Sequence, residues 1–400
     1  AQSLTSASFI AMFSLTAIVA ARLSGSDDLA GWPATVGLLG RAALAFPIGW
    51  VMDRIGRRFG LSIGYFVGGA GALITVFAII RADFWLMLFG SVLLGMARSA
   101  AEQAPYIAAE VQPAAKRARA IGSIVFAGTV GAVFGPLSTA PSESVALAFG
   151  LPAEAGPWGL GMLLFLLAVA LIIFFLRPDP LALGRQMAAD ESAANTTPTD
   201  NTLRPLRAIL IQPMVLLAIA SMAIGQLVMT MLMVITPLFM AYCGHPTSYI
   251  SWAVMAHTLG MFGLSGVTGW LIDKTSRITM MVAGALLLVL SGLLAPIATP
   301  MPIVTILMFV LGLGWNFCHI SGASLLSDQL RSTERGRIQG TSEMFVALSS
   351  GIGSFASGYL FSRLGYSGVG FVGIAISTAL VIIVGLVLLT QRPPTAPQPA

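Results

Sequence analysis

The stretch GWVMDR at residues 49–54 returns as GWLIDK at residues 269–274, 220 positions further along the chain. A second pair of stretches, KRARAIG at 116–122 and ERGRIQG at 334–340, matches at the nearly equal offset of 218. Two separate matches at nearly one offset indicate that the chain consists of two related halves. Each copy of GW-x-x-D-basic follows an apolar run, so it places an acid and a base at the end of a predicted membrane helix.

The composition is typical of a membrane protein. Of the 400 residues, 56% are hydrophobic and only 9% are charged, whereas a soluble domain carries about 25% charged residues. The formal net charge is +5, but the basic residues form short clusters between apolar runs, which indicates a topology signal and no nucleic-acid partner. Cys243 and Cys318 lie in apolar stretches without metal-ligand spacing, so neither a disulfide nor a metal site is expected.

Twelve apolar runs are long enough to cross a bilayer core, which needs about 20 residues per helix. They lie near 4–22, 31–52, 60–80, 84–109, 119–140, 157–176, 209–240, 248–272, 278–298, 301–327, 337–361 and 367–390. The long polar stretch between the sixth and seventh runs lacks a periodic apolar face and is interpreted as a flexible tether. The predicted domains are therefore an N-terminal six-helix bundle (1–176), a cytoplasmic linker (177–208) and a C-terminal six-helix bundle (209–400).

The loop charges predict the orientation of these helices. Of the 21 Lys and Arg residues, 16 fall in loops on one side and three on the other, while Arg41 and Arg98 lie inside runs. Positive loops stay in the cytoplasm. We therefore expect an integral protein of a bacterial-type inner or plasma membrane with both termini cytoplasmic.

The pattern G-x-x-x-D-R-x-G-R-R at 49–58 resembles motif A of the major facilitator superfamily, and it lies between the second and third runs, where that motif belongs. The fifth run is similar to motif C of the drug:proton antiporter branch. Its matching residues are Gly122, Gly131, Gly135 and Pro136. Thr139 replaces the last glycine of that motif, and Ser91 stands where the motif B arginine is expected. The resemblance implies an all-α major facilitator fold with 12 transmembrane helices in two pseudo-symmetric bundles.

The motif A loop and its repeat predict a cytoplasmic gate. Charges at helix ends can bridge neighbouring helices in one state and separate in the other, which biases a two-state equilibrium. The predicted gate residues are Gly49, Asp53, Arg54, Gly56, Arg57, Arg58, Gly269, Asp273, Lys274 and Arg277. The second copy has fewer arginines than the first. The alternative is that these charges are only positive-inside anchors.

Four ionisable residues lie well inside predicted spans: Arg41, Arg98, Glu102 and Glu343. Charges at membrane depth are costly and are usually functional. Arg98 and Glu102 are four positions apart on one helix face and can pair. We expect Glu102, or failing that Glu343, to carry a coupling proton, and the arginines to contact substrate or control the acid. The alternative is a structural ion pair that locks helix packing.

Neutral polar and aromatic side chains are expected to complete a substrate cavity. Together with Arg41 and Arg98 they are Tyr106, Gln226, Thr230, His257, Trp315, Asn316 and His319. By the repeat offset, Asn316 takes the position of Arg98 in the first half. For the histidines and aromatics the alternative is ordinary packing.

These features predict a secondary active transporter that moves a small organic solute by alternating access. Proton-coupled efflux is the first hypothesis, and proton-symport uptake of an anionic or vitamin-like solute is the alternative. A non-transporting relative of the same fold is a third, although such a protein would be expected to lose the gate charges. The chain has no nucleotide-binding glycine loop and no nucleophile–base set, so an enzyme is not expected. We expect a monomer in contact with lipid and solute, without a cofactor, driven by a proton gradient.

Overall fold

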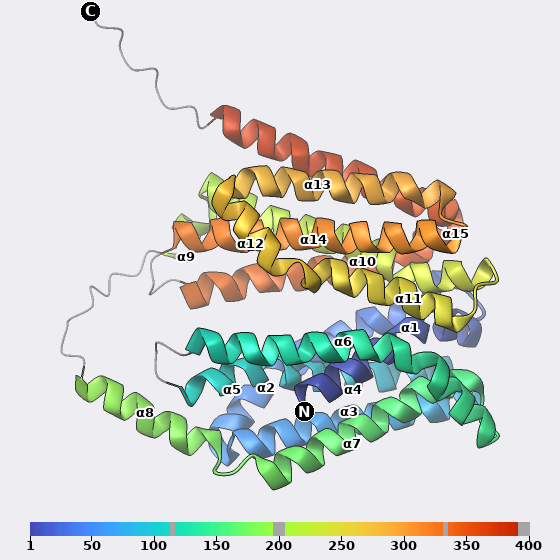
Figure 1. Cartoon of the computed structure of the whole chain (residues 1–400), viewed down its shortest axis with the longest axis horizontal. Helices are drawn as coiled ribbons and strands as arrows, with labels where there is room; N and C mark the ends of the chain where they lie inside the picture. Colours follow the sequence, from blue (N-terminus) through green and yellow to red (C-terminus); the bar gives the residue numbers. More distant parts are fainter. Residues whose placement is uncertain (113–116, 195–204, 331–334, 391–400) are drawn as a thin grey trace, which may run out of the picture. The chain divides into compact units, whose positions relative to one another are not determined.

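In the computed structural model of this chain, residues 1–112, 117–194, 205–330 and 335–390 are described (Figure 1). The described part is built from helices joined by short turns. In chain order the elements are α1 (Gln2–Ser24), η1 (Asp27–Leu29), α2 (Trp32–Ile55), α3 (Arg57–Arg81), α4 (Phe84–Ala101), α5 (Ala104–Glu110), α6 (Arg117–Ala148), η3 (Ala153–Ala155), α7 (Gly156–Phe175), α8 (Pro180–Ala194), α9 (Leu206–Leu210), α10 (Pro213–Tyr242), α11 (Thr247–Thr258), the π-helical η4 (Leu259–Gly263), α12 (Ser265–Lys274), α13 (Arg277–Leu294), η5 (Ala295–Ile297), α14 (Met301–Gln329) and α15 (Arg335–Thr390).

The described residues contain nine helices that are long and apolar enough to cross a membrane, or ten if a bent pair within α2 counts as one span. Part of the difference from twelve lies in α15, which holds two predicted spans and bends at Gly365, where φ is 66°. The predicted span 119–140 falls within α6, part of whose side chains lie outside the described residues. The all-helical membrane fold is confirmed, and the number twelve stays a prediction.

Local sequence signals start several of these helices. The Asp83 carboxylate accepts a hydrogen bond from Leu86 N at 3.0 Å and caps α4. The Ser276 hydroxyl does the same for α13 through Thr279 N, also at 3.0 Å. These side chains replace partners that the first backbone N–H groups of a helix lack. Such caps are readable from sequence because they involve only neighbouring residues.

Contacts divide the chain into two compact units, each described by itself. Unit 1 comprises 1–200, 233–258 and 354–365, and unit 2 comprises 201–232, 259–353 and 366–400. The division passes through α10 and α15 and falls between α11 and η4. The C-terminal part of α10, the whole of α11 and a middle segment of α15 therefore belong to the same unit as the first half. The predicted division into 1–176, a linker at 177–208 and 209–400 stays a prediction.

The core of unit 1 is an aromatic and small-residue cluster between α1, α3, α4 and α7. Phe165 is fully buried, and its ring packs edge-on against Phe9 with centroids 5.3 Å apart. A Cβ on Gly64 of α3 would lie 2.1 Å from Ala100 Cβ of α4, so the two helices approach very closely there. Small residues permit such contacts between membrane helices. In Figure 1 the long helices α3 and α7 run side by side.

The tether interpretation is wrong for residues 180–194, which form helix α8. This helix packs against α3 and α5, and Pro180 at its start is buried. These contacts supply the apolar surface that the sequence of α8 does not show as a periodic stripe. The following residues, 195–204, lie outside the described part.

Candidate functional site

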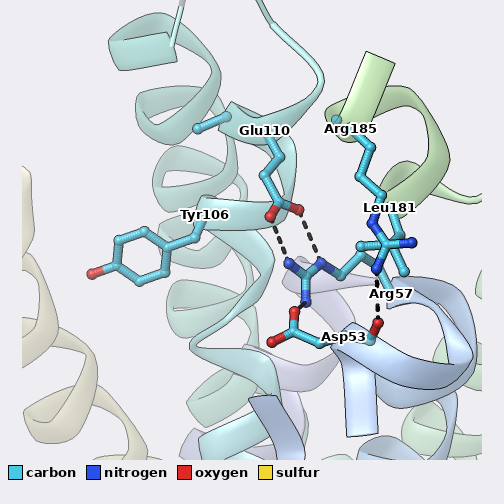
Figure 2. A pocket seen from close by; sticks show the side chains of 8 residues that line it. Asp53, Arg57, Tyr106, Glu110, Leu181 and Arg185 are labelled. Atoms are coloured by element: carbon cyan, nitrogen blue, oxygen red, sulfur yellow. Dashed lines mark hydrogen bonds and ion pairs between the residues drawn. The ribbon is translucent and has the colours of Figure 1, made fainter. Parts of the chain in front are cut away.

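Arg57 is the centre of an ion-pair cluster where α2, α3 and α5 meet (Figure 2). Its Nη1 lies 2.6 Å from Asp53 Oδ1, one helical turn back. Its Nε and Nη2 bind Glu110 Oε2 and Oε1 at 2.9 and 2.6 Å. Such two-point contacts between guanidinium and carboxylate are strong and directional. Arg57 therefore joins three helix ends through two acids.

Asp179, which lies between α7 and α8, caps the start of α3. Its carboxylate accepts hydrogen bonds from Arg57 N at 3.0 Å and Arg58 N at 3.1 Å. The approach is possible because Gly56 has φ of 102° and no side chain; a Cβ there would lie 2.3 Å from Asp179 Oδ2. A negative charge at a helix N-terminus is also favoured by the helix dipole. Glycine at position 56, which the sequence predicts as a gate residue, is therefore required for the contact between Asp179 and the start of α3.

We call the residues Asp53, Arg57, Glu110, Asp179 and Arg185 the first latch cluster. Arg185 of α8 donates from Nη2 to the backbone oxygen of Asp53 at 3.2 Å. The cluster borders a pocket of about 490 Å³. Tyr106 also lines this pocket, and its side chain points away from the ion pairs (Figure 2). The sequence-predicted cavity residue Tyr106 therefore lies beside the gate residues, largely exposed.

The second half contains a reduced version of the same arrangement. Arg277 Nε lies 2.8 Å from Asp328 Oδ2. Arg277 follows Arg57 by 220 positions and Asp328 follows Glu110 by 218, the two offsets of the sequence repeat. In the part of the chain that the structure describes, Asp273 has no ion-pair or hydrogen-bond partner, unlike Asp53. Among the described residues, the second half therefore keeps the counterpart of the Arg57–Glu110 pair and lacks that of the Arg57–Asp53 pair.

The tryptophan and the basic residue of each GW-x-x-D-basic stretch interact with each other. The Arg54 guanidinium lies 4.0 Å from the ring centroid of Trp50, and Lys274 Nζ lies 4.2 Å from that of Trp270. Both indoles are about half exposed. A cation over an aromatic ring at a helix end is an arrangement suited to a membrane interface. Arg54 and Lys274, predicted to belong to the gate, thus each contact a ring of their own helix, whereas Arg57 pairs with acids of α2 and α5.

Arg58 contacts the end of α7, whose last carbonyls have no helical partner. Its Nη2 donates to Ile173 O, and its guanidinium lies 5.4 Å from the ring of Phe59. By contrast Gly49 and Gly269, also predicted for the gate, have no atom within 4 Å of an added Cβ. Close packing therefore gives no reason for glycine at those two positions.

A second charge cluster lies inside unit 1, where the fourth predicted span is broken between α4 and α5. Glu102 is the residue after α4, and both of its oxygens face arginines. Arg41 Nε lies 2.8 Å from Oε2, and Arg98 Nε lies 3.5 Å from Oε1. The Arg98–Glu102 pair that the spacing predicts is present, but the shorter contact comes from Arg41 of α2. We call these three residues the charge triad.

The side chains of the charge triad are partly exposed to solvent. The side chains of Arg41, Arg98 and Glu102 are 37%, 51% and 38% exposed. The Arg98 guanidinium also lies 5.3 Å from the ring of Phe9. With all three groups ionised the triad carries one surplus positive charge. A site of this kind can attract one negative group, or release its arginines when the acid is protonated.

In unit 2, Gln226 joins α10, α14 and α15 through a closed network. Its Oε1 accepts from Trp315 Nε1 at 2.7 Å, and its Nε2 donates to Thr230 Oγ1 at 3.0 Å and to Ser350 Oγ at 3.3 Å. Thr230 and Ser350 are 3.2 Å apart. Three of the four members were predicted from sequence. Ser350 was not, since a serine in an apolar helix is too common to single out.

The side chain of Asn316 forms hydrogen bonds with the eighth predicted span where that span is divided into α11, η4 and α12. Its Nδ2 donates to Met261 O at 2.6 Å and to Ser265 Oγ at 2.9 Å, and its Oδ1 accepts from Thr268 at 2.6 Å. These partners lie on both sides of the junction between η4 and α12. A π-helical segment often marks a functional site. Asn316 therefore has a positional role, although the repeat offset aligned it with Arg98.

The remaining predicted site residues are not drawn into these clusters. His257 is fully buried in α11, and Glu343 is exposed in α15 of unit 2. Gly131 and Gly135 pack against the backbone of α1, and Pro136 is buried inside α6. Gly122 lies in α6, but its surroundings fall outside the described residues. No group of three or more potential metal ligands occurs among the residues that the structure describes.

At the opposite end of unit 1 from the first latch cluster, acids of the first half bind hydroxyls of the second. Tyr242 donates to Asp27, and Ser362 donates to Asp28. Thr247 Oγ1 donates to Glu143 Oε1 at 3.1 Å. A hydrogen bond from a side chain to the backbone adds to these contacts, since Ser354 Oγ donates to Gly31 O at 2.9 Å.

Burial at this closed end raises the pKa of Glu143, a half-buried residue beyond the predicted span 119–140. The hydrogen bond from Thr247 opposes the increase, and the charge of Glu154 adds to it. Sequence reasoning missed these acids because carboxylates between predicted spans are common and only their partners distinguish them.

Comparison with known proteins identifies the family. The family model described as Major Facilitator Superfamily matches residues 3–249 and 219–400. The chain is 32% identical over 371 residues to the "Uncharacterized MFS-type transporter YdeG" of Bacillus subtilis (strain 168), covering 92% of this chain and 85% of that protein. It is 27% identical over 389 residues to the "Riboflavin transporter RfnT" of Brucella anthropi, covering 96% and 92%.

Solved structures agree on the fold. A bacterial homologue of the human lysosomal transporter Spinster, in an inward-facing and occupied conformation, superimposes with a TM-score of 0.67 at 15% identity. The match covers 98% of this chain and 96% of that chain.

Proposed function

Since this chain belongs to the major facilitator superfamily and its relatives are transporters rather than enzymes, we propose that it carries a small organic anion together with a proton. The observation that carries the proposal is the charge triad, in which Arg41 and Arg98 share the single acid Glu102. In this scheme Glu102 is the proton site and the arginines are the anion site. The resulting function is uptake by proton symport, driven by an inward proton gradient.

The charge balance of the triad favours symport over exchange. In the empty state Glu102 neutralises one arginine. A bound anion competes with this carboxylate for the same guanidinium groups, and protonation of Glu102 removes the competitor. Proton and anion therefore bind best together, and the triad keeps one surplus positive charge before and after loading. A cationic solute would instead face two arginines at the moment Glu102 loses its proton.

The first latch cluster and the Arg277–Asp328 pair of the second half, which we call the second latch cluster, supply a means of alternating access. The first latch cluster holds helix ends through Arg57, and its repeat holds others through Arg277. Breaking such pairs in one state and forming them in another lets a small charge change bias a two-state equilibrium. With the orientation that the loop charges predict, these clusters face the cytoplasm and the Asp27–Tyr242 closure faces outward.

Proton-coupled efflux is a second candidate, favoured by the antiporter-like glycines of α6. A Cβ on Gly131 would lie 2.0 Å from Ser3 O, so α6 and α1 touch at this point. A close α1–α6 contact could resist leakage in an exporter. This contact is weaker evidence for the direction of transport than the charge triad is for the charge of the solute.

A vitamin-like solute is also supported by similarity to the riboflavin transporter. This similarity supports the type of molecule that is transported, and it does not indicate whether transport is coupled to protons.

The deciding experiment uses purified protein in liposomes with an imposed pH gradient of either sign. A panel of organic anions, neutral vitamins and cations is tested for uptake, with internal pH recorded by a trapped dye. The proposal expects anion uptake that brings protons inward and that Glu102→Gln uncouples from pH. Glu154→Gln is the matched control, because Glu154 also pairs with an arginine, Arg22, at the end of unit 1. Proton outflow on cation addition would favour efflux instead.

A further inference from the structure

Three aromatic rings gather in unit 2 between α14 and η4. The imidazole of His319 stacks on the indole of Trp315 with centroids 4.7 Å apart and planes 15° from parallel. The ring of Phe262 meets the same indole nearly perpendicularly, at 5.9 Å and 73°. Offset-stacked and edge-to-face pairs are the preferred geometries of aromatic rings. Both contacts of the Trp315 indole therefore have one of these geometries.

The indole of Trp315 is fixed in place by its polar edge. Trp315 Nε1 donates to Gln226, whose amide is in turn held by Thr230 and Ser350. The hydrogen-bonding capacity of Gln226 is therefore largely used inside the protein. The ring surface that stays accessible is that of His319 and Phe262, whereas the Trp315 indole is only 9% exposed.

His319 is the member with unused capacity. Within the described part of the chain it makes no hydrogen bond or ion pair, and its stacking on Trp315 is its only ring contact. Its Nδ1 is buried without a hydrogen-bond partner there, yet the side chain as a whole is partly exposed. A buried polar atom without a partner needs an explanation, and a bound ligand or water is a common one. Phe262 is 40% exposed and adds accessible ring surface.

We propose that Trp315, His319 and Phe262 form the binding face for a planar heteroaromatic group of the transported solute. The solute ring stacks in line with the Trp315–His319 pair, and a polar atom on its edge bonds to the imidazole. This inference rests on the proposed transport function and names the chemical class of one part of the substrate. A purely structural ring cluster would need no heteroatom and would not discriminate between solutes.

The test uses the full-length protein in detergent, with lumiflavin and adenine as planar probes and sorbitol as a non-planar control. Binding of lumiflavin is followed by quenching of its fluorescence, and binding of adenine and sorbitol by equilibrium dialysis. We expect saturable binding of a planar probe, a dissociation constant about tenfold higher in His319→Leu, and a smaller loss in His319→Phe, which keeps a ring without nitrogens. His245→Leu is the matched control, because His245 also contacts an aromatic ring, that of Tyr249, at 6.1 Å.

Two results overturn the inference: no saturable binding of either planar probe to the wild type, or equal affinity in wild type and His319→Leu. Neither result concerns Glu102, so proton-coupled uptake would still stand. Conversely, pH-independent uptake by the wild type would overturn the proton proposal and leave probe binding unaffected. Thermal unfolding of each variant confirms that it is folded.

Discussion

Arg41 Nε lies 2.8 Å from Glu102 Oε2, closer than the 3.5 Å that separates Arg98 Nε from Oε1 of the same carboxylate. The helix neighbour four positions away is thus the weaker partner, and the residue from another helix is the stronger. This order turns a local ion pair into a bridge between α2 and the end of α4. It also ranks the two arginines for experiment.

Arg41→Gln is expected to reduce anion uptake more than Arg98→Gln. Loss of a charge-assisted hydrogen bond of about 1.5–3 kcal/mol corresponds to at least about a tenfold loss, and the exposure of the triad places the effect toward the lower end. Initial uptake rates in liposomes measure both variants, with Arg22→Gln as a control that removes an arginine outside the triad. A larger loss in Arg98→Gln would contradict the ranking.

Asp53→Asn is expected to slow transport, whereas Asp273→Asn is expected to have a small effect. Asp53 holds Arg57 at 2.6 Å, whereas Asp273 has no partner in the described ranges. Both substitutions keep the size of the side chain and remove its charge. Turnover in the same vesicle assay, normalised to the inserted protein, provides the comparison. Equal effects would show that the two latch clusters act alike.

Asp179→Ala is expected to lower the stability of the folded protein by about 1 kcal/mol, the usual cost of losing a helix N-cap. Two backbone N–H groups of α3 would lose their acceptor. Thermal unfolding in detergent measures the change, with Asp273→Ala as the control acid. An unchanged transition would mean that water replaces the carboxylate at no cost.

Gly131→Ala is expected to impair folding or packing, whereas Gly159→Ala is expected to be tolerated. A Cβ at 131 would lie 2.0 Å from a backbone oxygen of α1, but one at 159 meets nothing within 4 Å. Overpacking typically costs about 1–3 kcal/mol, while an alanine in an open helix position stabilises by up to about 1 kcal/mol. Expression level and unfolding temperature distinguish the two. Tolerance at 131 would show that α1 and α6 separate easily.

Acidic medium is expected to favour the closed arrangement of Glu143 and Thr247. Burial raises the pKa of Glu143 above the ordinary 4.5 in this arrangement, so the closed form binds the proton more tightly. The stabilisation of the closed arrangement by protonated Glu143 is complete below pH 4.5. It is lost as the pH rises through the raised pKa of Glu143. Each pKa unit of difference changes the population ratio about tenfold.

Spin labels on the ends of α6 and α11 report the distance as a function of pH. Glu143→Gln should abolish the pH dependence that this group contributes. The neighbouring charges of Arg22 and Glu154 remain in both proteins, so the variant isolates the effect of Glu143. A pH dependence that persists unchanged in the variant would assign it to another group.

Much of the candidate site could be predicted because membrane-depth charges are rare. Arg41, Arg98 and Glu102 stood out against apolar neighbours, and the structure brings them together. Helical spacing also predicts the Arg98–Glu102 pair, since residues four apart share a face. Glu343 stood out by the same rule, yet the structure leaves it exposed in unit 2. Rarity identifies candidates but does not say which of them meet.

By itself the sequence determined that this protein is a duplicated, helical membrane transporter of its family, because composition, run length and motif spacing are properties of consecutive residues. Only the tertiary structure decided which charges act together. In the structure Arg41 is closer than Arg98 to Glu102, and Asp179 caps α3. The structure also separated Arg57, which bridges helices, from Arg54, which lies over Trp50. These contacts depend on how helices that are far apart in the chain pack against each other. No local sequence pattern encodes that packing.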